Sequence, residues 1–197
     1  MIITVASFKG GVGKTTTAVH LAAFFHLRAP TVLVDGDPNR SVTHWDRRGH
    51  LPFKVIDERH VARHVSAYQH VVIDTEARPD NDDLKALAEG CDLLVVPTTP
   101  DALSLDALML TIDAFQQIGA TNYRVLLTMI PPKPSRDGED ARQLLQEAHI
   151  PLFAGTIRRL VAFQKAALQG KVVLDVHDPR ADHGWADYTR IGEEIAG

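Results

Sequence analysis

A glycine-rich loop constrains this chain more than any other feature. Phe8-Lys9-Gly10-Gly11-Val12-Gly13-Lys14-Thr15-Thr16 lies between an apolar run at 2–6 and a segment with helical spacing at 17–25. Strand, loop and helix in this order are the context of a phosphate-binding loop. Glycines let backbone N–H groups turn toward an anion without Cβ clashes, and the positive end of the following helix faces the same anion. We therefore expect Lys14 to reach the β- and γ-phosphates of a nucleotide and the Thr15 hydroxyl to ligate Mg²⁺.

Two other apolar runs end in acidic residues. Asp35-Gly36-Asp37-Pro38 closes the run that begins at Thr31, and Asp74 closes the run that begins at His70. The carboxyl edge of a parallel sheet is where open α/β folds bind ligands. Asp74 therefore fits a Walker B position that holds Mg²⁺ through a water beside Thr15. An apolar run ending in Asp is common in itself, and here its separation from the glycine loop by a crossover makes it informative.

The glycine loop departs from the ordinary pattern, which has glycine where this chain has Phe8. Its Lys-Gly-Gly-Val-Gly-Lys-Thr-Thr sequence resembles the deviant Walker A loop of the ParA/MinD family of ATPases, and the resemblance extends from Met1 to the segment near Gly170. It implies ATP as the ligand and a homodimer in which Lys9 touches the nucleotide of the partner subunit. It also implies that Asp37 holds the attacking water and that Asp35 lies near the metal. The implied catalytic residues are Lys9, Lys14 and Asp37, the implied metal residues are Thr15, Asp35 and Asp74, and the implied loop contacts to ATP are Lys9, Gly10, Gly11, Val12, Gly13, Lys14, Thr15 and Thr16.

The remaining pattern predicts an α/β fold. Further strands are expected at 92–97 and 125–129, with a short edge strand at 53–57 and another at 151–153. The segments between strands are long enough for helices, which predicts a mainly parallel twisted sheet with helices on both faces. Residues 1–197 are expected to form one P-loop ATPase domain. Expected helices include 58–68, 104–118, 137–149 with Asp137 as cap and Leu144 and Leu145 facing inward, 158–169 and 182–196.

The family resemblance also places the adenine. It implies that the loop after the strand at 125–129 encloses the base, with Pro131 or Pro132 on its face and Thr128 near its edge. A proline-stiffened loop without a role in binding explains the same residues equally well.

Composition limits the possible partners. The net charge of −4 means that any nucleic-acid binding must come from a local basic patch. Cys91 is the single cysteine, which excludes an internal disulfide and suits a reducing cytosol. No apolar run approaches the length of a membrane span, so a cytoplasmic protein without membrane attachment is expected. His60 and His64 would share a helix face, and a solvated helix is favoured there over a zinc site because no third ligand is in view.

One basic patch is predicted on the helix expected at 158–169, which Gly170 would end. On a helical wheel its basic residues lie opposite its apolar ones, and Lys171 follows just beyond the helix. We expect the ATP dimer to bind DNA without sequence preference through this patch, although a solvated amphipathic helix with incidental arginines is the alternative. The predicted DNA contacts are Arg158, Arg159, Lys165 and Lys171.

These features predict an ATP-hydrolysing dimerisation switch associated with the bacterial nucleoid. The resemblance implies that its cargo is a plasmid, a chromosome locus or a protein body such as a microcompartment, with a ParB-like or adaptor protein stimulating hydrolysis. A MinD-like membrane-cycling ATPase is disfavoured because residues 191–197 are acidic and short, and an iron–sulfur relative needs a second cysteine. A metabolic ATP-dependent ligase of related fold stays open. The switch II segment, Glu76-Ala77-Arg78-Pro79, departs from the family pattern, so its behaviour is also open.

Overall fold

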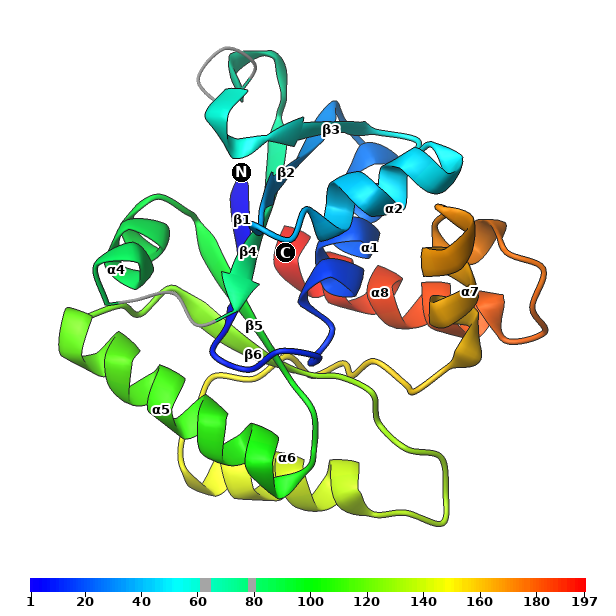
Figure 1. Cartoon of the computed structure of the whole chain (residues 1–197). Coiled ribbons are helices and arrows are strands. Elements are labelled where there is room, and N and C mark those ends of the chain that lie inside the picture. The colour runs from blue at the N-terminus through cyan, green and yellow to red at the C-terminus, as the bar shows by residue number, and fades with distance from the viewer. Residues whose placement is uncertain (61–64, 78–80) are drawn as a thin grey trace.

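A parallel sheet runs through the centre of the molecule, as the computed structural model of residues 1–60, 65–77 and 81–197 shows (Figure 1). Among these described residues the sheet has six strands in the order β3-β2-β4-β1-β5-β6, and all of its paired strands are parallel. The predicted fold class is therefore confirmed. The strands are β1 Ile2–Ser7, β2 Thr31–Gly36, β3 Lys54–Asp57, β4 His70–Ala77, β5 Leu93–Thr98 and β6 Tyr123–Leu127.

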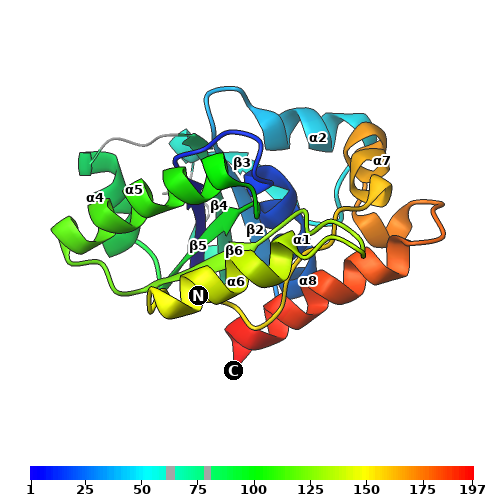
Figure 2. The same ribbon diagram turned by 90° about the horizontal axis from the view of Figure 1, so that it is seen from below.

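Helices cover both faces of this sheet, as two views at right angles show (Figures 1 and 2). On one side of the sheet lie α1 Lys14–His26, α2 Ser41–Gly49 and α8 Ala181–Ala196, with α7 Val161–Gln169 packed on α2 and α8. The other face packs against α4 Asn81–Glu89, α5 Ala102–Ile118 and α6 Asp137–Glu147. Short 3-10 helices are η1 Glu58–His60, η2 Val65–Ala67 and η3 Val173–Asp175.

The strands read as apolar runs because both of their faces are buried. On β1, Ile3 and Val5 join the core beneath α1 and α8, whereas Ala6 joins the core beneath α4 and α5. The carboxyl end of this central strand leads into the glycine loop. Its neighbours β4 and β2 end at the same edge, and Asp35 pairs in register with Asp74 there. The order of the strands thus brings the loop and the predicted acidic residues together.

Several local predictions need correction. Helix α6 is preceded by Arg136 as its cap residue, so Asp137 lies in the first turn, and Leu144 is 49% exposed while Leu145 is buried. The strand expected at 151–153 is reduced to one parallel bridge between Val125 and Leu152.

The segment after β3 and the C-terminal basic segment also differ from expectation. The helix expected at 58–68 is described only at its ends, which are the 3-10 turns η1 and η2, and residues 61–64 lie outside the described part. The candidate zinc pair, the side chains of His60 and His64, lies outside it too. Among the described residues no group of three or more His, Cys, Asp or Glu is arranged to hold a metal ion. Helix α7 begins at Val161, three residues later than predicted, because Arg158 is extended and forms a parallel bridge with Ile130.

Candidate nucleotide site

The glycine loop has the backbone form that its sequence predicts. Gly11 and Gly13 have φ angles of 80° and 91°, in the left-handed region that favours glycine. The Thr128 hydroxyl, just after β6, lies 2.8 Å from the carbonyl oxygen of Val12 and 3.0 Å from that of Thr98. It therefore links the loop to the ends of β5 and β6. Lys14 begins α1 and is 8% exposed, with its Nζ 3.5 Å from the carbonyl oxygen of Lys9. Burial lowers the pKa of Lys14, while the negative charges of Asp74 and Asp37 oppose that shift.

Below the loop lies a pair of strand-end carboxylates, which the structure brings together with Thr15 as predicted. The Thr15 hydroxyl donates a 2.7 Å hydrogen bond to Oδ2 of Asp74. Oδ2 of Asp35 accepts from the backbone N–H of Thr43 at 2.9 Å and from its hydroxyl. The remaining oxygens, Oδ1 of Asp35 and Oδ1 of Asp74, are buried and have no hydrogen-bond partner among the described residues.

These unpartnered oxygens are the observation that points most directly to a ligand. A buried carboxylate oxygen without a partner costs folding free energy, so its place in a folded protein calls for a bound group. Burial raises the pKa of Asp74 to about 7, against the opposing hydrogen bond from Thr15 and the charge of Lys14. Two carboxylate oxygens near a threonine hydroxyl are the hard oxygen donors that Mg²⁺ prefers. The residues present therefore fit the predicted metal.

Asp37 directly follows the last residue of β2 and begins the turn that leads into α2. It is 9% exposed, and its Oδ1 accepts hydrogen bonds from the backbone N–H and the side-chain amide of Asn39, at 2.8 and 2.9 Å. Next to it, Arg40 has a left-handed backbone and ties this turn to the edge strand through a 2.8 Å ion pair with Asp57. The turn thus holds the Asp37 carboxylate within range of the Lys14 charge.

Lys9 is engaged within its own chain. Its Nζ lies 3.1 Å from Oδ1 of Asp101 and 2.7 Å from Oγ of Ser104 at the start of α5. Hydrogen bonds from Thr99 and Ser104, then from Lys9, hold the pKa of Asp101 well below its usual range. Sequence reasoning missed both partners, although Pro100-Asp101 before a helix is a recognisable cap signal.

A cavity of about 580 Å³ opens beside this contact, lined among others by Lys9, Gly10, Gly11, Val12, Asp101, Pro131 and Arg159.

A second cavity, of about 240 Å³, adjoins the other side of the loop. It touches Gly13 and Thr16, and its wall is more apolar, with Met129, Leu160 and Phe163. Thr128 lines this second cavity and Pro131 lines the larger one, whereas Pro132 is exposed. The predicted adenine residues are therefore divided between two cavities. Sequence reasoning missed the apolar wall because Leu160 and Phe163 come from the C-terminal segment.

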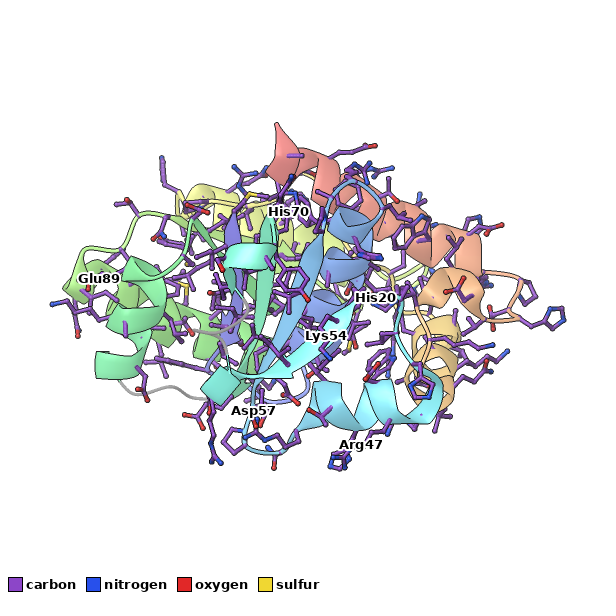
Figure 3. All side chains as sticks on the ribbon, turned by 90° about the horizontal axis from the view of Figure 1, so that it is seen from above. His20, Arg47, Lys54, Asp57, His70 and Glu89 are labelled. Carbon is purple, nitrogen blue, oxygen red and sulfur yellow. The ribbon has the colours of Figure 1, made fainter. Side chains whose placement is uncertain are left out.

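His20 links the loop to that C-terminal segment. It is fully buried, its Nδ1 lies 2.6 Å from the carbonyl oxygen of Thr16, and its Nε2 accepts a 3.0 Å hydrogen bond from the backbone N–H of Val173. Since Nε2 is an acceptor, the proton is on Nδ1 and the ring is neutral. Burial lowers the pKa of His20 to about 4. The ring stacks on Tyr188 and meets the edge of Phe163, on the side of α1 that faces α7 and α8 (Figure 3).

The predicted DNA patch is only partly available in the structure. Arg158 forms a 2.7 Å ion pair with the buried Asp187, and Lys165 forms one of 2.7 Å with Asp178. Arg159 and Lys171 are exposed and have no ion pair among the described residues. The helical wheel that suggested the patch is wrong, because Arg158 and Arg159 precede α7 and the apolar Val161 and Leu168 are 60% and 75% exposed.

The glycine loop, the strand-end acids and the parallel sheet together define a P-loop nucleotide-binding domain. Residues 3–173 match the family described as the CobQ/CobB/MinD/ParA nucleotide binding domain, and the chain belongs to that family of ATPases. No helix among the described residues has the length and apolar composition needed to cross a bilayer. Of the predicted switch II segment, Arg78 and Pro79 lie outside the described part.

Individual relatives place the chain within this family. It is 37% identical to the "Maintenance of carboxysome distribution protein A" of Gloeobacter kilaueensis, over 98% of this chain and 93% of the relative. The solved structure of apo McdA from Cyanothece has a TM-score of 0.74 at 16% identity, covering 100% and 99% of the two chains. A putative plasmid partition protein of Borrelia burgdorferi bound to AMPPNP has a TM-score of 0.75 at 18% identity, covering 99% and 98%. At these identities the two solved structures show a shared fold.

Proposed function

We propose that this protein is an ATP-hydrolysing dimerisation switch that positions a cargo over the bacterial nucleoid. The observation that supports it most is the pair of unpartnered, buried oxygens on Asp35 and Asp74, next to Thr15 and below the phosphate-binding loop. The match with the carboxysome distribution protein over nearly the whole chain favours a protein body, such as a microcompartment, as the cargo.

The proposed chemistry is charge stabilisation and positioning. The loop N–H groups and Lys14 bind the phosphates of ATP, and the apolar cavity beside Gly13 and Thr16 is the proposed place of the nucleoside. Thr15, Asp35 and Asp74 would hold Mg²⁺, which neutralises charge on the β- and γ-phosphates when it is bound. Asp37 orients the attacking water, and its hydrogen bonds from Asn39 fix the carboxylate in place.

Lys9 makes dimerisation part of the proposed mechanism. In the partner subunit's site it would contact the nucleotide, and to do so it must leave the contact with Asp101 and Ser104 that it makes in its own chain. ATP binding and release of Lys9 are therefore linked in this proposal, and hydrolysis dissolves the dimer.

The ATP dimer is also proposed to bind DNA without sequence preference, which anchors it to the nucleoid. Arg159 and Lys171 are the members of the predicted patch that remain available to phosphates, since Arg158 and Lys165 are held in ion pairs. A ParB-like or adaptor protein on the cargo would stimulate hydrolysis and release the dimer.

The experiment compares Asp37→Ala with the wild type by ATP turnover, ATP affinity and light scattering. We expect the variant to bind ATP, accumulate as a dimer and lose at least about 100-fold in turnover, because the phosphate cradle is untouched while the water loses its partner. Asp113→Ala removes an exposed acid from α5 and serves as the matched control, with wild-type turnover expected. Rapid turnover by Asp37→Ala would remove Asp37 from the proposed role. Turnover that requires a small-molecule acceptor would replace the switch with a metabolic ligase.

A further inference from the structure

Helix α2, the first helix after the Asp37 turn, has a basic outer face. At about 100° per residue, with the buried Val42 at zero, Arg47, His44 and Arg48 lie near 140°, 200° and 240°. The buried Trp45 lies near 300°, on the side of the core. His44, Arg47 and Arg48 are exposed, and Arg47 lies on the outer side of the helix (Figure 3). The acidic residue of the helix, Asp46, lies near 40° and accepts a 2.8 Å hydrogen bond from the backbone N–H of Leu51.

The edge of this face at Arg48 adjoins the end of α7. The indole N–H of Trp45 donates to the carbonyl oxygen of Lys171 at 3.0 Å, and Nε of Arg48 donates to that of Ala167 at 2.7 Å. Between these bonds the two backbones meet at glycines. A Cβ at Gly49 would lie 2.1 Å from the carbonyl oxygen of Gln169, and a Cβ at Gly170 would lie 2.1 Å from the backbone nitrogen of Gly49. The junction fixes Lys171 beside the C-terminal end of α2, as Figures 1 and 2 both show for the two helices.

We propose that this α2–Lys171 ridge binds the phosphate backbone of duplex DNA. The inference rests on the DNA-binding step of the proposed function and assigns most of that step to a surface outside the predicted patch. The ridge consists of His44, Arg47, Arg48, His50 and Lys171.

The charge on the ridge suits a phosphate backbone. It has three permanent positive charges per subunit and six per dimer, with two histidines between them, on a protein whose net charge is −4. Arg47 and Lys171 have no ion pair among the described residues, and the terminal nitrogens of Arg48 have no acceptor there because its one hydrogen bond is made by Nε. Arginine and lysine side chains that carry no protein partner can displace the counterions of DNA. The outer face of α2, formed by His44, Arg47 and Arg48, has no large apolar side chain for insertion into a bilayer, which favours DNA over a membrane surface.

The ridge is also connected to the nucleotide site. The first turn of α2 is held by Asp35, whose Oδ2 accepts both the N–H and the hydroxyl of Thr43. The other oxygen of the same carboxylate is the unpartnered one that fits Mg²⁺. One side chain therefore joins the metal position to the helix that carries the ridge, which gives ATP a short structural path to the DNA-binding surface.

The test measures binding of a fluorescent 30-base-pair duplex by anisotropy, with ATP and Mg²⁺, over a series of salt concentrations. Arg47→Glu/Lys171→Glu should bind DNA roughly 100-fold more weakly than the wild type at low salt. Its slope of log affinity against log salt should be less steep by about 4, because four phosphate contacts per dimer are removed. ATP turnover without DNA should stay at the wild-type value, since neither residue touches the site.

A double variant of equal charge change, Lys85→Glu/Arg136→Glu, serves as the control. These residues lie at α4 and before α6, away from α2, so wild-type affinity is expected (Figure 1). If the wild type itself does not bind DNA with ATP, the DNA-binding step of the proposed function fails and the ridge fails with it. If the wild type binds and the ridge variant binds equally well, or the control loses as much affinity, the ridge alone is wrong. Unchanged DNA binding with loss of binding to anionic phospholipid vesicles would assign the ridge to a membrane instead.

Discussion

Two buried aspartates on opposite sides of α1 show how differently one residue type is used in this molecule. Asp74, at the loop, accepts a hydrogen bond from Thr15 on one oxygen and has no partner among the described residues for the other. Asp187, on α8, accepts from the backbone N–H of Arg158 and from its guanidinium, with distances of 2.7 to 3.2 Å. The second acid is satisfied by the fold itself, whereas the first is satisfied only when something else binds. For these two aspartates, we infer that the incomplete hydrogen bonding of Asp74 reflects a ligand site and that the complete bonding of Asp187 reflects a role in the scaffold.

The variant Asp74→Asn should have the largest effect, because it changes ATP turnover strongly and stability little. We expect ATP turnover to fall about 1000-fold, because a neutral amide cannot replace a carboxylate at the metal position. The free energy of unfolding without ligand should stay within about 1 kcal/mol of the wild type, since a poorly satisfied buried carboxylate is lost. Phosphate release and urea unfolding measure the two quantities. A large loss of stability with normal turnover would reverse the two roles.

Both ring nitrogens of His20 have hydrogen-bond partners, as the oxygens of Asp187 do, and the pH dependence of stability tests this assignment. Its pKa is about 4 in the folded protein against 6.5 unfolded, so both forms are neutral above pH 6.5. Below that value the unfolded chain binds the proton first, and stability is lost as pH falls from 6.5 toward 4. The loss from this group should reach about 3 kcal/mol. Urea unfolding from pH 7 to 4.5 should show this slope in the wild type and a shallower one in His20→Gln; equal slopes would contradict the assignment.

Asp187→Asn should lower the stability of the fold and leave the rate of ATP hydrolysis unchanged. It weakens a charged pair whose arginine is 45% exposed, so the expected loss is about 2 kcal/mol, less than for a fully buried pair. The folded variant should hydrolyse ATP at a rate near that of the wild type at 15 °C. Calorimetric melting and turnover on the same preparation check both statements. A variant that melts normally and has lost turnover would place Asp187 in the site.

The smallest expected effect follows from weakening the contact between Lys9 and Asp101, which Lys9 must leave in the proposed dimer. Asp101→Asn keeps the cap of α5, because asparagine also accepts from the Ser104 N–H, and weakens the contact with Lys9. Light scattering with ATP should then show dimers at a protein concentration roughly three- to tenfold lower, as a weakened charged hydrogen bond implies. Lys9→Ala should prevent ATP dimerisation, and normal dimers in that variant would contradict the role of Lys9 in the partner's site.

The sequence predicts the residues of the site better than the packing of the scaffold. The loop, Thr15 and the strand-end acids were identified because each lies at a fixed place next to a strand, and the strand order then assembled them. The start of α7 and the burial of its residues could not be predicted from periodicity. Arg158 is extended because it forms a parallel bridge with Ile130 and an ion pair with Asp187, which are contacts between distant parts of the chain. The α2–Lys171 ridge was missed for a related reason. Its parts are more than a hundred residues apart in sequence, and only the packing of Gly49 on Gly170 makes them one surface.

The hydrogen bond between Trp45 and Lys171 gives the molecule its own optical probe. The chain has two tryptophans, so Trp185→Phe leaves Trp45 as the single strong emitter. Its indole is 4% exposed, with its N–H on a carbonyl oxygen and the ring of His20 at 6.2 Å between centroids. The wavelength and lifetime of its fluorescence therefore report the junction between α2 and α7 without any label. Stopped-flow emission on mixing with ATP would give the rate at which a change in the nucleotide site reaches this distant surface.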